Sequence, residues 1–349
     1  MASITMYAVF AGADFGGGFW DLVAGGDRRG WEPRQLIDES ITPVWEGNHV
    51  WLVFALVIFW TAFPDGFASV MTVLALPLWL ALGGIVLRGA GFAFRKEITR
   101  PLLVRAAGAT FAFSSLMTPF FMGAVVGAIA AGAVPATGDR ASLQAWTSWT
   151  PILAGFVFVA ACAYLAAVYL SGEAARRGDR RLESYFSRRA QAAALVTGAL
   201  SLGALAELHN ADPELEARLT GRALPLVIIA GVCGLAVLGL LAARRVMVAR
   251  FVAALGVAAV VWGLGVAQYP VLLPGTTVTL DNAGAPEATL TAMIAVAILL
   301  VLLVIPSFGL LFTLQSRRML RGSPLQPEPL AGAGRTTERA TENHGTGEG

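Results

Sequence analysis

The sequence carries little charge for its length and almost no lysine. Of its 349 residues, 14% are charged and 56% are apolar, and the mean hydropathy is +0.67. A water-soluble domain carries about a quarter charged residues, so this chain has too little polar surface for a globule in water. Its formal net charge is only +2 and Lys96 is its one lysine, which argues against a nucleic-acid partner. The composition therefore indicates a membrane protein.

Long apolar runs take the place of the missing charge. A helix that crosses the hydrocarbon core needs about 20 mostly apolar residues. The candidate runs are 2–23, 49–64, 66–88, 103–132, 150–171, 190–208, 223–243, 250–270 and 289–314. The segment Phe63-Pro64-Asp65-Gly66 predicts a tight turn between the second run and the third. The sequence thus predicts an all-α, polytopic membrane protein with about nine transmembrane helices.

The composition changes sharply after the last run. We predict a membrane domain over residues 1–316 and a disordered cytoplasmic tail over residues 317–349, which is rich in Gly, Pro, Thr and Glu. The longest basic connection, 172–189, separates four predicted helices from the next four. The predicted units are a first four-helix bundle at about 1–132, a second at about 150–270, and a peripheral last helix at about 289–314.

Arginines alternate between the predicted connections. The odd-numbered connections and the start of the tail are rich in arginine, whereas the even-numbered connections are poor in it. The fifth connection alone holds Arg176, Arg177, Arg180, Arg181, Arg188 and Arg189. Because cytoplasmic loops carry the excess of Lys and Arg, the pattern predicts an N-terminus outside the cell and a C-terminus in the cytoplasm.

Histidine and cysteine are too scarce for an obvious metal site. Cys162 and Cys233 both lie in apolar runs, which predicts small buried side chains rather than a disulfide or a metal pair. Of the three histidines, His344 lies in the predicted tail. The predicted topology puts His49 at the inner face and His209 at the outer face, about 30 Å apart. They cannot share one iron. Haem ligation by His49 alone stays open as an alternative, but we expect neither metal nor haem in this chain.

Asp14 is an ionisable residue inside the first predicted span, where such groups are costly and are functional candidates. It lies in Gly12-Ala13-Asp14-Phe15-Gly16-Gly17-Gly18. Gly12 and Gly16 form a small-xxx-small pair that admits a close neighbouring helix. Two interpretations stay open. Asp14 belongs to a proton path or holds a partner's cation, or it hydrogen-bonds the backbone near a helix end.

A second constellation lies at the predicted cytoplasmic mouth of the second span. It reads Pro43-Val44-Trp45-Glu46-Gly47-Asn48-His49-Val50-Trp51. Glu46 is placed to take protons from cytoplasmic water. The alternative is an acid near a helix N-terminus, which the helix dipole favours. Trp45 and Trp51 would also suit the aromatic belt at the membrane interface.

Two further motifs are less specific. Arg88 and Arg95 bracket the segment that closes the third span, where they would clamp acidic groups of loops or lipids, or anchor the helix at the cytoplasmic face. Pro119 lies inside the fourth span, and Gly123 and Gly127 give that helix a second close-packing face. A kinked, glycine-faced helix of this kind is typically structural.

In their order along the chain, these motifs resemble subunit II of cytochrome bd quinol oxidases. The Asp14 segment is similar to the first-span signature of that family. The stretch from Pro43 to Leu52 is similar to its most specific signature, in which the acid is Asp or Glu. Two more stretches are similar to the family: Arg88-Gly-Ala-Gly-Phe-Ala-Phe-Arg95, and Gln268-Tyr269-Pro270 through Pro274 with Asp281-Asn282-Ala283. The resemblance covers about residues 7–316.

The resemblance implies a complex in the bacterial plasma membrane that oxidises quinol and reduces dioxygen to water. It implies a partner, subunit I, which binds two haems b and one haem d, so that this chain carries no haem and is not catalytic alone. A small accessory subunit, membrane lipids and quinone are further partners to expect, and nucleic acid is not. Protons would come from the cytoplasm.

The resemblance also implies roles for single residues. An acid matching Glu46 lies on the proton route to the oxygen-reducing haem, and an acid matching Asp14 is linked to proton delivery. A tryptophan matching Trp51 lies near an apolar oxygen path. The remaining candidates are structural or interface residues: Trp45, Asn48, Arg88 and Arg95.

Two alternatives belong to other functional classes. A secondary transporter of a small solute would also use intramembrane carboxylates and broken helices, and Asp14 and Pro119 would fit it. Against it, the two halves show no matched pair of interrupted helices. A membrane cytochrome in its own right would bind haem through His49 and would lose its haem band when His49 is changed.

Overall fold

The computed structural model describes residues 1–25, 27–97 and 101–316. Within these ranges the side chains of residues 27–29, 42–46, 92–97 and 101–105, and of several positions near the end of the last helix, lie outside the description. The tail predicted over 317–349 also lies outside it. The chain divides into two compact units, Met1–Met293 and Ile294–Gly349, and each is described by itself.

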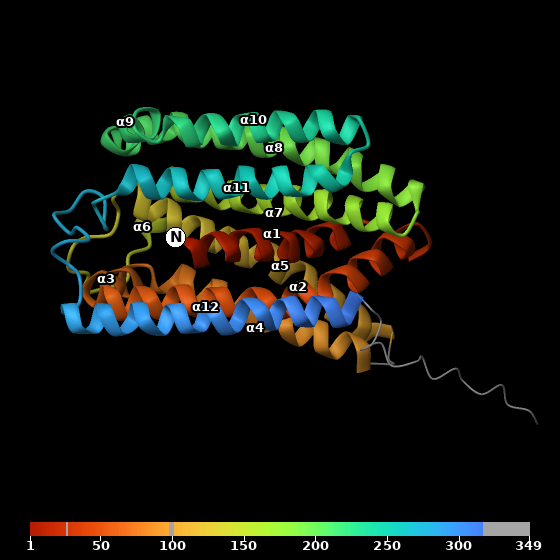
Figure 1. Ribbon diagram of the computed structural model, residues 1–349, viewed down its shortest axis with the longest axis horizontal. Helices are drawn as coiled ribbons and strands as arrows, with labels where there is room; N and C mark the ends of the chain where they lie inside the picture. Colours follow the sequence, from red (N-terminus) through yellow and green to blue (C-terminus); the bar gives the residue numbers. More distant parts are fainter. Residues whose placement is uncertain (26, 98–100, 317–349) are drawn as a thin grey trace, which may run out of the picture. The chain divides into compact units, whose positions relative to one another are not determined.

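The regular structure in the described residues is helical, apart from one isolated bridge between Val271 and Thr279. This confirms the all-α prediction (Figure 1). The helices are α1 (Ala2–Leu22), α2 (Asp27–Ala62), α3 (Pro64–Val73), α4 (Ala75–Glu97), α5 (Pro101–Ala130), α6 (Gln144–Thr147), α7 (Trp149–Arg176), α8 (Arg180–Ala211), α9 (Pro213–Thr220), α10 (Leu224–Ala242), α11 (Val246–Gln268) and α12 (Glu287–Ser316).

Six helices in the described part of the chain are long and apolar enough to cross a membrane. They are α5, α7, α8, α10, α11 and the first part of α12. The bent pair formed by α2 from Gly47 and by α3 would make a seventh. The apolar part of α4, Ala75–Gly91, is shorter, and α1 is not among the six. The protein is therefore an all-α membrane protein with six to seven candidate spans, and nine spans stays a prediction.

The second helix begins well before its predicted start at residue 49. α2 starts at Asp27, and its N-terminal half is amphipathic: Leu36, Ile37 and Ile41 are buried, while Gln35 and Glu39 are exposed. The buried positions recur with the period of an amphipathic helix. A search for unbroken apolar runs misses such a helix, because polar residues interrupt the pattern. The first half of α2 is thus a helix that packs on the protein, not a loop.

The third predicted span, 66–88, is broken in two at Leu74. Pro77 has no backbone N–H, so it cannot donate to the carbonyl of Val73 as a continuous helix requires. The backbone N–H of Ser142 donates to that carbonyl instead, at 3.0 Å. The predicted turn before this segment is confirmed, because α3 starts with Pro64 and is bent by 117° from the end of α2.

Helix α7 lies at the centre of the first unit and packs against α1, α5, α8 and α11 (Figure 1). The glycine faces that the sequence predicts on α1 and α5 pack directly against α7. A β-carbon at Gly12 or Gly16 would collide with the α7 residues Leu165 and Cys162. Gly123 and Gly127 of α5 approach another part of α7 as closely. These contacts hold α1 in the protein interior, and Asp14 with it.

Candidate functional site: a buried ion pair between α1 and α4

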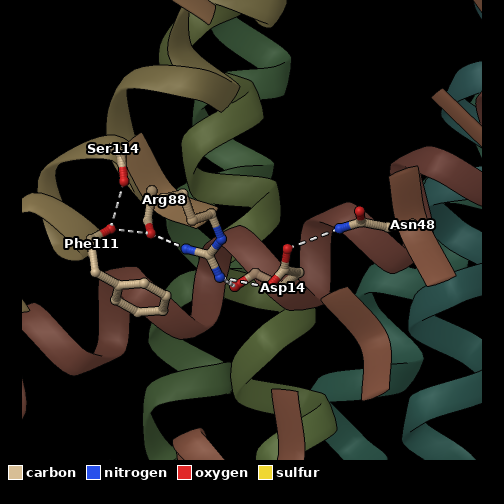
Figure 2. A network of polar contacts seen from close by, with 6 residues as sticks. Asp14, Asn48, Arg88, Phe111 and Ser114 are labelled. Atoms are coloured by element: carbon tan, nitrogen blue, oxygen red, sulfur yellow. Dashed lines mark hydrogen bonds and ion pairs between the residues drawn. The ribbon is translucent and has the colours of Figure 1, made fainter. Parts of the chain in front are cut away.

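Asp14 and Arg88 form an ion pair inside the first unit. Asp14 is 0% exposed and Arg88 is 1% exposed. The Nη2 atom of Arg88 lies 2.5 Å from Oδ1 of Asp14 and also donates to the backbone oxygen of Asp14 at 2.8 Å (Figure 2). One guanidinium nitrogen thus binds both the side chain and the main chain of the same residue.

Glycine near the C-terminal end of α1 makes room for the arginine. A β-carbon at Gly18 would collide with the hydroxyl of Ser115 and would come within 2.9 Å of Nη1 of Arg88. One turn earlier on the same helix, Asp14 meets the same guanidinium group. The glycines of this segment therefore let α4 and α5 approach α1 while Arg88 lies between them.

The second terminal nitrogen of Arg88 is held by α5, whereas its buried Nε has no hydrogen-bond partner among the described residues. The Nη1 atom donates to Oγ of Ser115, which in turn donates to the backbone oxygen of Phe111 at 2.5 Å. The ring of Phe111 lies 4.3 Å from the guanidinium carbon, and the ring of Phe15 lies 5.2 Å from it. Aromatic faces at this distance attract a cation, more so where water is excluded. Arg88 is thus fixed by both hydrogen bonds and rings.

Asn48 of α2 completes the surroundings of Asp14. Its Nδ2 donates to Oδ2 of Asp14 at 2.8 Å, and Asn48 is 1% exposed (Figure 2). Both carboxylate oxygens of Asp14 therefore accept a hydrogen bond. Four helices, α1, α2, α4 and α5, meet in this network. Removal of one partner from a buried ion pair costs about 3–5 kcal/mol, because the other charge stays buried without compensation.

The structure brings three of the candidate residues together: Asp14, Asn48 and Arg88. Arg88 was expected to clamp acidic groups of loops or lipids, or to anchor the helix, and the structure buries it against an acid of its own chain. Asp14, which is buried and lies within α1, binds this cation. Trp51, one turn beyond Asn48 on α2, is 8% exposed and belongs to the buried side of the helix.

Three candidates cannot be placed in the same way. Trp45 and Glu46 lie on α2 and Arg95 lies on α4, but their side chains are outside the described residues. The network also contains residues that the sequence did not single out, above all Ser115 and Phe111. Ser114, Ser115 and Thr118 are buried polar residues inside an apolar helix. This pattern is typical of helix contacts in membranes and was available as a signal.

The described residues hold no group of three or more His, Cys, Asp and Glu side chains arranged to bind a metal ion. His209 has a 72% exposed side chain, 3.7 Å from a carboxylate oxygen of Glu216. Cys233 is buried, Cys162 is half-buried, and both are free thiols. Within the described residues, Asp14–Arg88 is thus the most deeply buried ion pair, while Glu173 and Asp21 are buried acids paired with the less buried Arg250 and Arg34.

Membrane-length helices around a buried Asp–Arg pair define a polytopic membrane protein with a charged interior. The chain belongs to the cytochrome bd terminal oxidase subunit II family, whose model matches residues 1–315. This confirms the resemblance that the motifs indicated, over nearly the whole chain.

Individual relatives agree over shorter stretches. Over 90 residues the chain is 29% identical to cytochrome bd ubiquinol oxidase subunit 2 of Bacillus subtilis (strain 168), a match that covers 26% of this chain and 27% of that protein. Over 92 residues it is 32% identical to cytochrome bd-I ubiquinol oxidase subunit 2 of Escherichia coli (strain K12), covering 26% and 24%. These matches thus span about a quarter of the length of the curated relatives.

A solved structure extends the likeness of the fold. The structure of bd oxidase from Geobacillus thermodenitrificans contains a chain that matches with a TM-score of 0.75. The match covers 90% of this chain and 95% of that chain at 24% identity. The fold described above is therefore shared across almost the full length of both chains.

Proposed function

We propose that the chain is the haem-free subunit II of a bacterial quinol:oxygen oxidoreductase of the cytochrome bd type. The observation that carries this proposal is the family match over residues 1–315, and the names of the relatives point the same way. A separate subunit I would hold two haems b and one haem d. The complex would oxidise quinol and reduce dioxygen to water in the plasma membrane. This chain scaffolds subunit I, with quinone, lipids and a small accessory subunit as further partners.

We propose nine spans for this subunit, with the N-terminus outside and the C-terminus in the cytoplasm. α1 has 21 residues, a length of about 32 Å at 1.5 Å per residue, and it runs against α5 and α7. The connections after α1, α7 and α10 meet at one end of the first unit (Figure 1). Ion pairs support this, since Arg177 binds Glu39 and Arg250 binds Glu173 there. An end so rich in arginine belongs in the cytoplasm.

Two acids are candidates for a proton path from the cytoplasm to the haem subunit: Glu46 and Asp14. Trp51 is the candidate for an apolar oxygen path. The burial of Asp14 at 0% and of Trp51 at 8% supports roles in the interior rather than at the lipid interface.

An optical spectrum tests the proposal most directly. The chain is purified alone and again after co-expression with a haem-subunit gene from the same genome. We expect haem bands and quinol-dependent oxygen uptake only in the co-purified complex. Haem bound by the isolated chain would favour a cytochrome in its own right. Solute uptake by vesicles that contain only this chain would favour a transporter.

A further inference from the structure

We infer that the start of α8 and the turn between α10 and α11 form a binding site for an anionic phospholipid, whose phosphate is held by Arg188, Arg244 and Arg245. The inference rests on the proposed orientation of this subunit, which puts this end of the helices in the cytoplasm. It gives the lipid partner a chemical class and a place. It follows from the position of the arginines, the backbone at one of them, and the apolar surface beside them.

The three arginines lie on neighbouring helix ends. Arg188 is in the third turn of α8, and Arg244 and Arg245 lie in the turn between α10 and α11. Gln191, one turn after Arg188, donates to the backbone oxygen of Leu238 on α10 at 3.5 Å. α8 and α10 therefore run side by side at this level (Figure 1). All three arginines are exposed.

Acids of the chain pair with several other arginines at this end of the first unit. The pairs are Arg177–Glu39, Arg181–Glu32 and Arg250–Glu173. Among the described residues, no acid lies within ion-pair distance of Arg188, Arg244 or Arg245. Their charges are therefore available to an anion from outside the described chain.

Arg244 stands where the backbone favours glycine. α10 ends in a Schellman turn, in which the N–H of Arg244 donates to the oxygen of Leu241 at 3.1 Å. The N–H of Arg245 donates to the oxygen of Leu240 at 2.8 Å. The φ of Arg244 is 57°, a left-handed conformation that a β-carbon disfavours. A glycine would form the same turn without this strain, so an arginine here indicates a use for its side chain.

Exposed apolar side chains continue from the arginines along both helices. On α8, Leu195 and Leu202 follow Arg188 at intervals of seven residues, which is close to two helical turns and places the three on one face. On α10, the exposed Leu235 and Ile228 form a second row with the same interval. A lipid with its phosphate at the arginines would lay its acyl chains along these rows.

The chemistry of the site favours an anionic lipid over other occupants. Guanidinium groups bind phosphate oxygens through several parallel hydrogen bonds. A zwitterionic head group brings a cation of its own into the arginine cluster, whereas an anionic head group does not. A free phosphate ion would leave the apolar rows unused. Basic pockets between transmembrane helices on the cytoplasmic side bind anionic head groups in this way.

Native mass spectrometry of the complex co-expressed with the haem subunit tests the inference. Phosphatidylglycerol and phosphatidylcholine with the same acyl chains are added separately to the delipidated complex, and the affinity for the first bound lipid is compared. One arginine near an anionic head group is worth about fivefold in affinity. We therefore expect wild type to prefer phosphatidylglycerol at least about tenfold, and Arg188→Gln/Arg245→Gln to lower the preference to about threefold or less.

The matched control removes the same charge from the same end of the protein. Arg177→Gln/Arg181→Gln changes two arginines that already pair with Glu39 and Glu32. We expect this control to keep the wild-type preference. An equal loss in both double variants would show an effect of total charge and would overturn the inference. A preference that Arg188→Gln/Arg245→Gln leaves intact would overturn it too.

Arg244→Gly separates lipid binding from a structural role. Glycine suits the left-handed conformation at this position, so the denaturation midpoint should stay equal or rise. We expect the preference for phosphatidylglycerol to fall at least about threefold in the same variant. An unchanged preference would remove Arg244 from the site. The haem absorbance of the wild-type sample reports separately on the proposed function, which fails if the haem subunit does not co-purify.

Discussion

Gly16 of α1 lies against the backbone oxygen of Cys162 on α7 so closely that a β-carbon at position 16 would overlap it. The obstacle is main chain, which cannot move aside as a flexible side chain can. Because α1 carries Asp14 two residues earlier, this contact also sets how deep the carboxylate lies in the protein.

We therefore expect Gly16→Ala to push α1 away from α7 and to lower the amount of assembled complex at least tenfold. Gly198→Ala is the matched control, since a β-carbon at position 198 of α8 has nothing within 4 Å in the described structure. Quantitative immunoblots of membranes would compare the two. Equal amounts of both variants would show that the α1–α7 contact is looser than the structure describes.

Ser115→Ala should destabilise the protein through Arg88. The change removes the acceptor for Nη1 of a buried guanidinium, and a buried donor left without a partner costs about 1–3 kcal/mol. Its neighbour Ser114 offers a close comparison, because among the described residues its hydroxyl bonds the backbone oxygen of Phe111 on its own helix and not Arg88. We expect the midpoint of thermal denaturation to fall clearly for Ser115→Ala and little for Ser114→Ala. The same midpoint for both would argue against the Ser115 contact.

Glu173 on α7 binds two arginines whose removal should have unequal effects. Arg250 of α11 is 3.2 Å from it with a side chain 19% exposed, whereas Arg176 is 54% exposed. Arg250 also covers the ring of Tyr169 at 4.4 Å. We expect Arg250→Met to lower stability more than Arg176→Met, which should cost less than about 1 kcal/mol. Denaturation midpoints would check this, and an equal loss would contradict the ranking.

Glu46→Ala should slow proton uptake in the complex while the haem content stays normal. A positioned proton carrier contributes typically about 10²–10⁴-fold to the rate of its step. Rapid mixing of the reduced complex with oxygen, in the presence of a pH-sensitive dye, would measure the rate. Glu39→Gln is the control on the same helix, since Glu39 is exposed and pairs with Arg177. Normal uptake by Glu46→Ala would remove Glu46 from the proton path.

Much of the helical arrangement could be predicted from apolar runs, because lipid leaves the backbone few alternatives to a helix. The exceptions have local causes. The first half of α2 buries Leu36, Ile37 and Ile41 in a helical period, which a search for spans passes over. Pro77 is a local signal for the break at Leu74. The carbonyl of Val73 then accepts from the backbone N–H of Ser142, which lies far along the chain and gives no local signal.

The site was predicted in part for a similar reason. Asp14 stands out because it is a charge among glycines and apolar residues. Burial of the Arg88 charge is as costly, but the sequence does not reveal it. An arginine near the end of a span is readily explained by the positive-inside rule. Nothing local links the two residues, which are 74 positions apart. Only the packing of α4 and α5 against α1 shows that each charge compensates the other.

That separation has a consequence for how the protein is made. α1 is not among the helices that are apolar enough to cross a membrane by themselves, and its acid has no counter-ion until α4 has been synthesised. At roughly 5–20 residues per second, the ribosome needs about 4–15 s to cover those 74 positions. We expect α1 to stay beside the insertion machinery during that interval and to settle in the bilayer together with α4. The order of synthesis then becomes part of the folding pathway.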